Sequence, residues 1–138
     1  KKIFQITFII FFFSNPIYAK TQYLEEGINF FKIKKFKQAQ FKFEKDIVFN
    51  PRSELSYLYL SKIFKNLDKK KLQEQNLNTV ILLNPKNEEA IYMLAKLKLT
   101  SSDYQKSKEL NKKLKKICNK FCNQSDKLKI EIENLSKK

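Results

Sequence analysis

The chain has 138 residues, enough for one small domain, and its net charge is +15, because 28 lysines and a single arginine, Arg52, outnumber 14 acidic residues. The absence of histidine removes the commonest general base and the usual Ser/His and Cys/His nucleophile pairs. The single glycine excludes loops that cradle phosphates, which need several glycines. We therefore expect a protein that is not an enzyme and has neither a cofactor nor a metal site.

The first nineteen residues have the layout of a secretory signal peptide. Two lysines precede an apolar run from Ile3 to Phe13, Asn15–Pro16 interrupts it, and Ala19 provides a cleavage site. The run is shorter than the roughly 20 apolar residues that a membrane-spanning helix needs. We expect a signal peptide at residues 1–19, cleaved after Ala19, and a periplasmic domain at residues 20–138. A retained anchor and a buried first helix are the alternatives.

Amphipathic helical patterns follow one another through the rest of the chain. Asn50–Pro51 and Asn84–Pro85 end two of them, because proline disfavours helical geometry in the residue before it. Ser53, Asn87 and Asp103 are suitable N-caps for the helices that follow them. No strand-like alternation of any length interrupts the series. The expected helices span about 21–33, 36–49, 54–66, 69–83, 88–100, 103–118 and 125–136.

The first two pairs of helices repeat at a spacing of 34 residues. Eight positions are identical: Tyr23/Tyr57, Leu24/Leu58, Phe30/Phe64, Lys35/Lys69, Lys37/Lys71, Ile47/Ile81, Asn50/Asn84 and Pro51/Pro85. Gly27, Ser61 and Ala95 form a series of small residues at the same spacing. A period of this length is typical of a solenoid, in which stacked copies of one unit bury a continuous core.

These residues resemble the tetratricopeptide repeat (TPR) family, whose pattern places large and small residues at fixed positions of a helical hairpin. The matching positions are Tyr23, Gly27, Phe30, Ala39, Phe43 and Pro51, then Tyr57, Ser61, Phe64, Leu77 and Pro85, and in a poorer third copy Ile91, Ala95, Tyr104 and Ser107. The resemblance implies an all-α, right-handed solenoid with repeats at about 20–53, 54–87 and 88–121 and a capping helix at about 125–136.

Gly27 lies inside a helical pattern, where glycine costs roughly 1 kcal/mol of helix propensity relative to alanine. A close approach of two helix backbones, which any Cβ would hold apart, is the expected compensation. An incidental glycine is the alternative.

Cys118 and Cys122, the only cysteines, stand at the corner where the third repeat lacks its proline. In an exported chain two cysteines favour a disulfide. The small loop limits its stabilisation to about 2 kcal/mol, so we expect the bond to fix this corner. Two packed thiols and a redox-active pair are alternatives, whereas two thiolates cannot fill a zinc site.

The resemblance implies a concave groove lined by the first helix of each repeat. The expected groove residues are Leu24, Ile28, Phe31, Leu58, Lys62, Lys65, Tyr92, Lys96 and Leu99. Each trio has i, i+4, i+7 spacing and so forms one helix face. The face changes from apolar to lysine-rich, which suits a peptide with hydrophobic anchors and an acidic end. Alternatively, Leu24, Ile28 and Phe31 belong to the core.

We therefore expect a scaffold for protein–protein interaction in the periplasm, with a protein or peptide partner. A lysine-driven binder of anionic membrane or cell-envelope polymer is the alternative. Nucleic acid is not an expected partner, because phosphate recognition favours arginine and the chain is expected to be exported. The sequence predicts neither the identity of the partner nor the oligomeric state.

Overall fold

The computed structural model describes residues 21–137, so the predicted signal peptide lies outside the described residues. Within this range the chain forms seven helices and no strand. The helices are α1 (Gln22–Lys32), α2 (Phe36–Phe49), α3 (Glu54–Asn66), α4 (Lys70–Leu83), α5 (Glu88–Thr100), α6 (Tyr104–Ile117) and α7 (Cys122–Leu135). None of these helices is long and apolar enough to cross a membrane.

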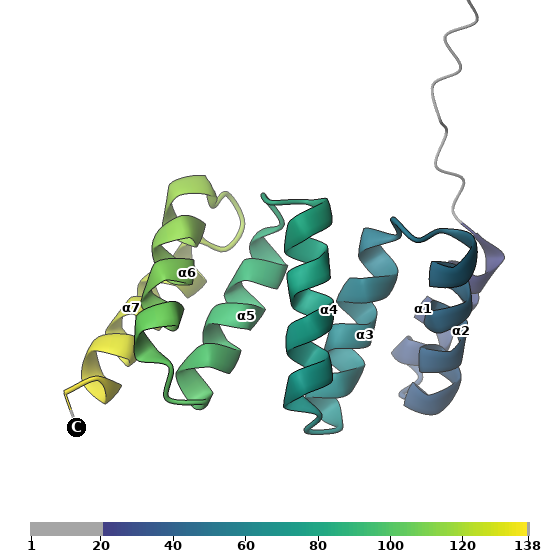
Figure 1. The fold of residues 1–138 in the computed structure, drawn as a ribbon, viewed down its shortest axis with the longest axis horizontal. Coiled ribbons are helices and arrows are strands. Elements are labelled where there is room, and N and C mark those ends of the chain that lie inside the picture. The colour runs from purple at the N-terminus through teal and green to yellow at the C-terminus, as the bar shows by residue number, and fades with distance from the viewer. Residues whose placement is uncertain (1–20, 138) are drawn as a thin grey trace, which may run out of the picture.

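The helices pack as three hairpins, α1 with α2, α3 with α4 and α5 with α6, followed by α7 (Figure 1). α1 contacts α3, Lys62 of α3 pairs with Glu89 of α5, and α5 contacts α7, so these four helices form one layer of the array. The second helices form the other layer, and α7 packs on both α5 and α6. The predicted all-α helical-repeat fold is confirmed.

Each hairpin turns at a residue in the left-handed conformation, and these residues are again 34 positions apart: Lys34 (φ 59°), Asp68 (φ 51°) and Ser102 (φ 61°). A backbone N–H just after each one donates to the preceding helix at 2.9 Å, in the pairs Lys35–Phe30, Lys69–Phe64 and Asp103–Lys98. This is the Schellman arrangement, which satisfies carbonyl groups that a helix end leaves free. The period therefore holds for the backbone as well as for the sequence.

All three predicted N-cap positions are confirmed, and at two of them the side chain makes the capping hydrogen bond. The side chains of Asn87 and Asp103 accept hydrogen bonds from the backbone N–H groups of Ala90 and Lys106, at 2.8 and 3.1 Å. Ser53 occupies the predicted N-cap position of α3, but its buried side chain makes no capping hydrogen bond.

The last helix begins at Cys122, earlier than the predicted start near Ser125. Ser125 is buried within the helix, and its hydroxyl donates to Oδ1 of Asn111 at 2.9 Å. In α4 the helical pattern of apolar residues would place Leu72 in the core, but Leu72 is exposed and Gln73 is buried. In both places a polar side chain occupies a buried position of the helix interface.

The core consists of two clusters along the array. The first joins α1, α2 and α3 and contains Leu24, Ala39, Phe43, Leu60, Ile63 and Phe64. The second runs from α3 to α7 and includes Leu77, Ile91, Leu94, Leu114 and Leu128 among others. Because the second cluster reaches α7, the last helix is an integral part of the folded array.

Gly27 does allow close packing, but its neighbour is a side chain and not the predicted second backbone. A Cβ at Gly27 would lie 2.7 Å from the Phe43 ring, which is far inside ordinary contact distance. Phe43 has no exposed surface, and its ring stacks on Tyr59 with centroids 5.1 Å apart. The glycine therefore makes room for an aromatic ring of α2.

Asp46 of α2 is fully buried, although an acidic residue in a helical pattern is usually placed on the solvated face. Its carboxyl group accepts hydrogen bonds from the hydroxyls of Thr21 and Ser56. Thr21 is also the N-cap of α1, accepting from the N–H of Leu24 at 3.1 Å. Asp46 therefore ties the start of α1 and the first turn of α3 to α2.

Candidate functional site

A hollow of about 440 Å³ lies on the layer of first helices, between α1, α3, α5 and the segment before α7. We call it the groove. Its lining residues are Phe31, Lys62, Lys65, Asn66, Glu89, Tyr92, Met93 and Phe121. Residues from three repeats and from the corner before α7 thus meet at one surface.

Aromatic side chains stand at both ends of the groove. At one end the ring of Phe31 meets the ring of Tyr59 edge-on, with centroids 5.0 Å apart. At the other end Tyr92 of α5 packs against Phe121, with centroids 5.6 Å apart. Aromatic side chains offer large apolar areas with few rotatable bonds, which is what a binding surface requires.

The charged groups of the groove differ in how far they are already paired. Nζ of Lys62 lies 2.8 Å from Oε1 of Glu89 and 5.0 Å from the centroid of the Tyr59 ring. Lys65 is exposed and forms no ion pair within residues 21–137. Lys65 is therefore the cation of the groove that is free to bind an anionic group.

The structure brings four of the nine predicted groove residues together at the hollow, namely Phe31, Lys62, Lys65 and Tyr92. The other five lie elsewhere. Leu24, Leu58 and Leu99 are buried in the core, Ile28 packs against the first core cluster, and Lys96 forms an ion pair with Glu131 of α7 at 2.5 Å. Leu99 belongs to the core cluster that also contains Leu128 and Ile132 of α7.

Four groove residues were missed: Asn66, Glu89, Met93 and Phe121. Asn66 lies one turn after Lys62, and Glu89 lies three positions before Tyr92, so helical spacing was a signal that could have found both. Met93 directly follows Tyr92 in the chain. Phe121 lies between the two cysteines, where a repeat pattern gives no indication of its direction.

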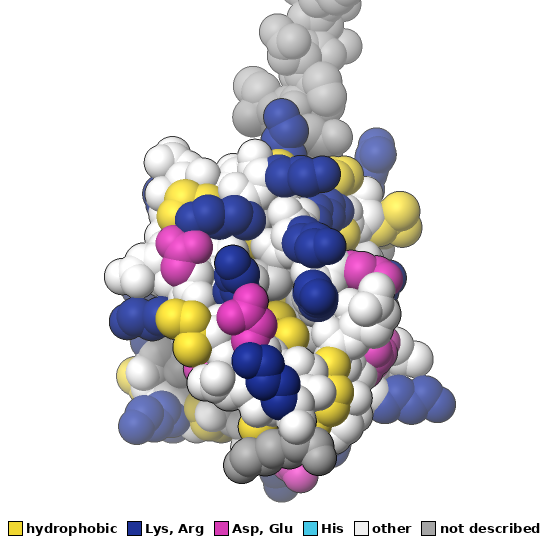
Figure 2. Space-filling model, turned by 90° about the vertical axis from the view of Figure 1, so that its left-hand side faces the viewer, with side chains coloured by type: hydrophobic (Ala, Val, Ile, Leu, Met, Phe, Trp, Pro, Cys, Tyr) yellow, Lys and Arg dark blue, Asp and Glu magenta, His cyan; other side chains and the backbone are white. Residues whose placement is uncertain are grey.

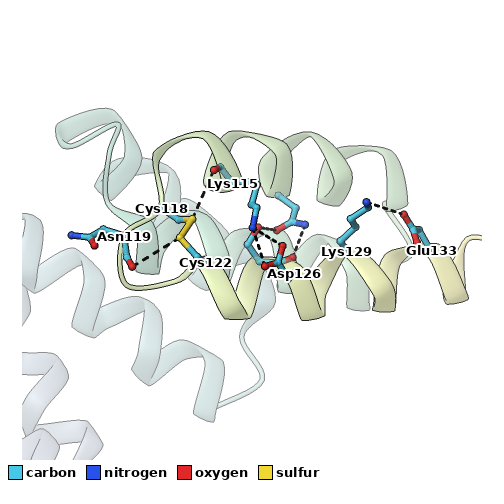
Figure 3. Close-up of polar contacts among 9 residues, drawn as sticks. Lys115, Cys118, Asn119, Cys122, Asp126, Lys129 and Glu133 are labelled. Carbon is cyan, nitrogen blue, oxygen red and sulfur yellow. Dashed lines mark hydrogen bonds and ion pairs between the residues drawn. A yellow bond between two sulfur atoms is a disulfide. The ribbon is translucent and has the colours of Figure 1, made fainter.

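The corner that holds Phe121 is fixed by two contacts. Cys118 and Cys122 form a disulfide that joins the end of α6 to the start of α7 (Figure 3). Glu88 of α5 accepts hydrogen bonds from three consecutive backbone N–H groups, those of Asn119, Lys120 and Phe121, at 2.8–2.9 Å. These contacts set the position of the groove wall at Phe121.

The Glu88 contact has a counterpart one repeat earlier. Glu54, 34 positions before Glu88, accepts hydrogen bonds from the side-chain amides of Asn84 and Asn87 at 3.0 and 2.5 Å. In the second and third repeats the first residue of the first helix therefore binds the corner at the end of that repeat. At the third corner Asn119 replaces proline, and its backbone N–H is one of the donors, which proline lacks.

The bonds from the N–H groups of Asn119, Phe121 and Lys120 lower the pKa of Glu88. A lowered folded-state pKa gives stability that is present above the unfolded-state pKa and is lost as the pH falls through the folded one. We therefore expect Glu88→Gln to be less stable than the wild type at about pH 6, with the difference shrinking below about pH 4. Denaturant unfolding of both proteins across this range measures the effect. An equal difference at both pH values would show that the charge of Glu88 does not hold the corner.

No grouping of His, Cys, Asp and Glu within residues 21–137 could hold a metal ion. The charged groups at the groove are instead a lysine–glutamate pair and a solvated lysine. This arrangement provides apolar contact and charge recognition, and it places no nucleophile beside a base.

The arrangement of hairpins is that of tetratricopeptide-repeat structures. Similar solved structures include the TPR2B domain of yeast Sti1 in a complex with pHsp70 (TM-score 0.76, 14% identity, 82% of this chain and 94% of that chain). Others are the Yersinia enterocolitica type III secretion chaperone SycD with a peptide of the translocator YopD (0.74, 16%, 85% and 93%) and the first TPR domain of Spaghetti (RPAP3) bound to the HSP90 peptide SRMEEVD (0.71, 16%, 83% and 90%).

No protein-family model matches the chain, and no curated protein matches it in sequence. The likeness to the solved structures is one of fold. The chain has the tetratricopeptide-repeat fold, as its 34-residue pattern predicted.

Proposed function

We propose that this protein is a non-enzymatic interaction scaffold whose groove binds a peptide segment of a partner protein. The observation on which the proposal rests is the hollow between three repeats, with aromatic side chains at both ends and a free lysine on its edge. Support comes from structures of the same fold, among them the RPAP3 domain with an HSP90 peptide and SycD with a YopD peptide.

The groove favours a peptide that combines an apolar side chain with a carboxylate. An apolar side chain can lie between Phe31 and Tyr92, where it removes aromatic surface from water. A carboxylate of the peptide can pair with Lys65, because Lys65 forms no ion pair with any carboxylate of the described residues. Since Lys62 is paired with Glu89, a second carboxylate would compete for a lysine that is already occupied.

We place this activity in the periplasm. The support is the leader-like pattern of residues 1–19 together with the disulfide between Cys118 and Cys122, a bond that persists in oxidising compartments. Detection of the mature protein in a periplasmic fraction, starting at Lys20, is the direct test. A chain that stays in the cytoplasm would overturn this assignment without affecting the groove.

Peptides selected from a random seven-residue library against the mature protein test the groove. We expect Tyr92→Ala to weaken the selected peptides about tenfold, since it removes one aromatic wall. Leu82→Ala is the control, because Leu82 is 81% exposed on α4 and does not line the groove. Fluorescence anisotropy at low and physiological salt measures both. Equal affinity for the two variants would refute the groove, and binding that collapses with salt would favour the lysine-driven alternative.

A further inference from the structure

A second hollow, also of about 440 Å³, lies along α6 and α7 at the C-terminal end of the array. Its apolar floor includes Tyr104 and Ile132. Four lysines line it, Lys108, Lys112 and Lys115 from α6 and Lys129 from α7, against two carboxylates, Asp126 and Glu133. Figure 2 views this end of the molecule and shows lysine side chains gathered over it, with hydrophobic side chains among them. We call this surface the end face.

The lysines of the end face are only partly neutralised. Lys115 pairs with Asp126 at 2.7 Å, and Lys129 lies 3.9 Å from Glu133, as Figure 3 shows. Lys108 and Lys112 form no ion pair within residues 21–137. The end face therefore has a positive surplus along the middle of a groove between two helices.

The buried polar groups beneath the end face are already satisfied. The side-chain amide of Asn111 donates to the carbonyl of Ser125 at 3.0 Å, and the hydroxyl of Ser125 donates back to Asn111 at 2.9 Å. These groups need no ligand. Recognition at the end face must therefore come from the lysines and from the apolar floor.

The 34-residue register shows that α7 differs from the other first helices. Lys129 falls on the position of Gly27, Ser61 and Ala95. In two of the hairpins this position directly meets the paired helix, since Gly27 lies under the Phe43 ring and the carbonyl of Ala95 accepts a hydrogen bond from Ser107 at 2.9 Å. The long side chain of Lys129 excludes the close backbone contact that a small residue allows, and it adds a positive charge to the end face.

We propose that the end face docks an acidic amphipathic helix of a partner protein. A helix fits the groove between two neighbouring helices by ridge-into-groove packing. The apolar stripe of the docked helix covers the apolar floor at Tyr104 and Ile132. Its carboxylates pair with Lys108, Lys112 and Lys129. This surface is separate from the groove of the proposed peptide-binding function, so either site can fail without the other.

The test uses a synthetic helical peptide with a leucine stripe, one tryptophan within that stripe and glutamates beside it. Because the protein contains no tryptophan, the emission reports the peptide alone. We expect binding to shift the emission to shorter wavelengths. Lys108→Glu/Lys112→Glu should weaken binding about fivefold, whereas Lys37→Glu/Lys71→Glu, an equal charge change at exposed positions of α2 and α4, should weaken it less than twofold.

Three outcomes would overturn the proposal: no emission shift with the wild type, equal weakening by both double variants, or equal binding of a scrambled peptide of the same composition. The last two would indicate attraction by net charge alone. Tyr92→Ala, which alters the groove, should leave this binding unchanged. Circular dichroism of each variant confirms that the helices are retained.

Discussion

Replacing Phe43 by alanine should lower the free energy of unfolding by about 3–5 kcal/mol, the usual cost of removing a fully buried aromatic side chain. Phe43 has no exposed surface, stacks on Tyr59 and lies directly over Gly27. Gly27, which lies against the ring, has no side chain that could fill the cavity left by Phe43→Ala. Denaturant unfolding measures the change. Phe41→Ala is the matched control in the same helix; Phe41 is 54% exposed, so its loss should cost less than about 1 kcal/mol.

The contact between Gly27 and Phe43 also predicts that the effect of Gly27→Ala on stability changes sign when the Phe43 ring is removed. In the wild type, Gly27→Ala gains about 1 kcal/mol of helix propensity but forces a Cβ to 2.7 Å from the Phe43 ring, an overpacking that costs about 1–3 kcal/mol. We therefore expect a net loss of stability. In a Phe43→Leu background the ring is gone, and Gly27→Ala should become neutral or stabilising. A double-mutant cycle measures this coupling, and a coupling of zero would contradict the packing role of Gly27.

The helices could be predicted from the sequence because their ends are marked locally. Asn–Pro pairs close α2 and α4, and Asn87 and Asp103 cap the helices after them. The 34-residue spacing then relates one hairpin to the next, so a single pattern predicts most of the fold. What this pattern did not reveal is the left-handed residue of each turn, since Lys34, Asp68 and Ser102 are not the glycine that this conformation favours.

The candidate site was less predictable, since helix periodicity does not separate core positions from groove positions on one wide apolar face. Leu58 and Tyr92 share a register position, yet Leu58 is 4% exposed while the longer Tyr92 reaches the groove. Contacts between residues that are far apart in the sequence could not be predicted either. Asp46 bonds to Ser56 across a corner, and Glu88 bonds to a backbone more than 30 positions later. Such contacts depend on how repeats stack, which local spacing does not determine.

Three departures from the repeat pattern nevertheless lie at the Glu88 corner, at the contact between α6 and α7 and at the end face. Asn119 replaces a proline and donates to Glu88. Asn111 replaces a large apolar residue and bonds to Ser125 of α7. Lys129 replaces a small residue at the end face. All three lie in the last third of the chain. There the array stops repeating, and polar contacts are added to the apolar contacts that join α7 to the array.

The Cys118–Cys122 disulfide also lies in this part of the chain, and its removal should have the second large effect on stability. Cys118→Ser/Cys122→Ser should lower the free energy of unfolding by about 2 kcal/mol, the loop-entropy value for a bridge that closes so few residues. Reduction of the wild type with dithiothreitol should give the same loss. The double variant treated with dithiothreitol is the control and should not change further. No loss in either protein would show that Glu88 alone fixes the corner.

The loss should also be local, because α7 has other contacts to the array. Leu128 is 1% exposed, and Asn111 and Ser125 bond between α6 and α7. We therefore expect hydrogen exchange to quicken at the amides of Asn119–Phe121 while the middle of α7 keeps its protection. Since Phe121 forms one wall of the groove, peptides that bind there should bind more weakly to the double serine variant. Faster exchange throughout α7 would mean instead that the disulfide holds the whole last helix in place.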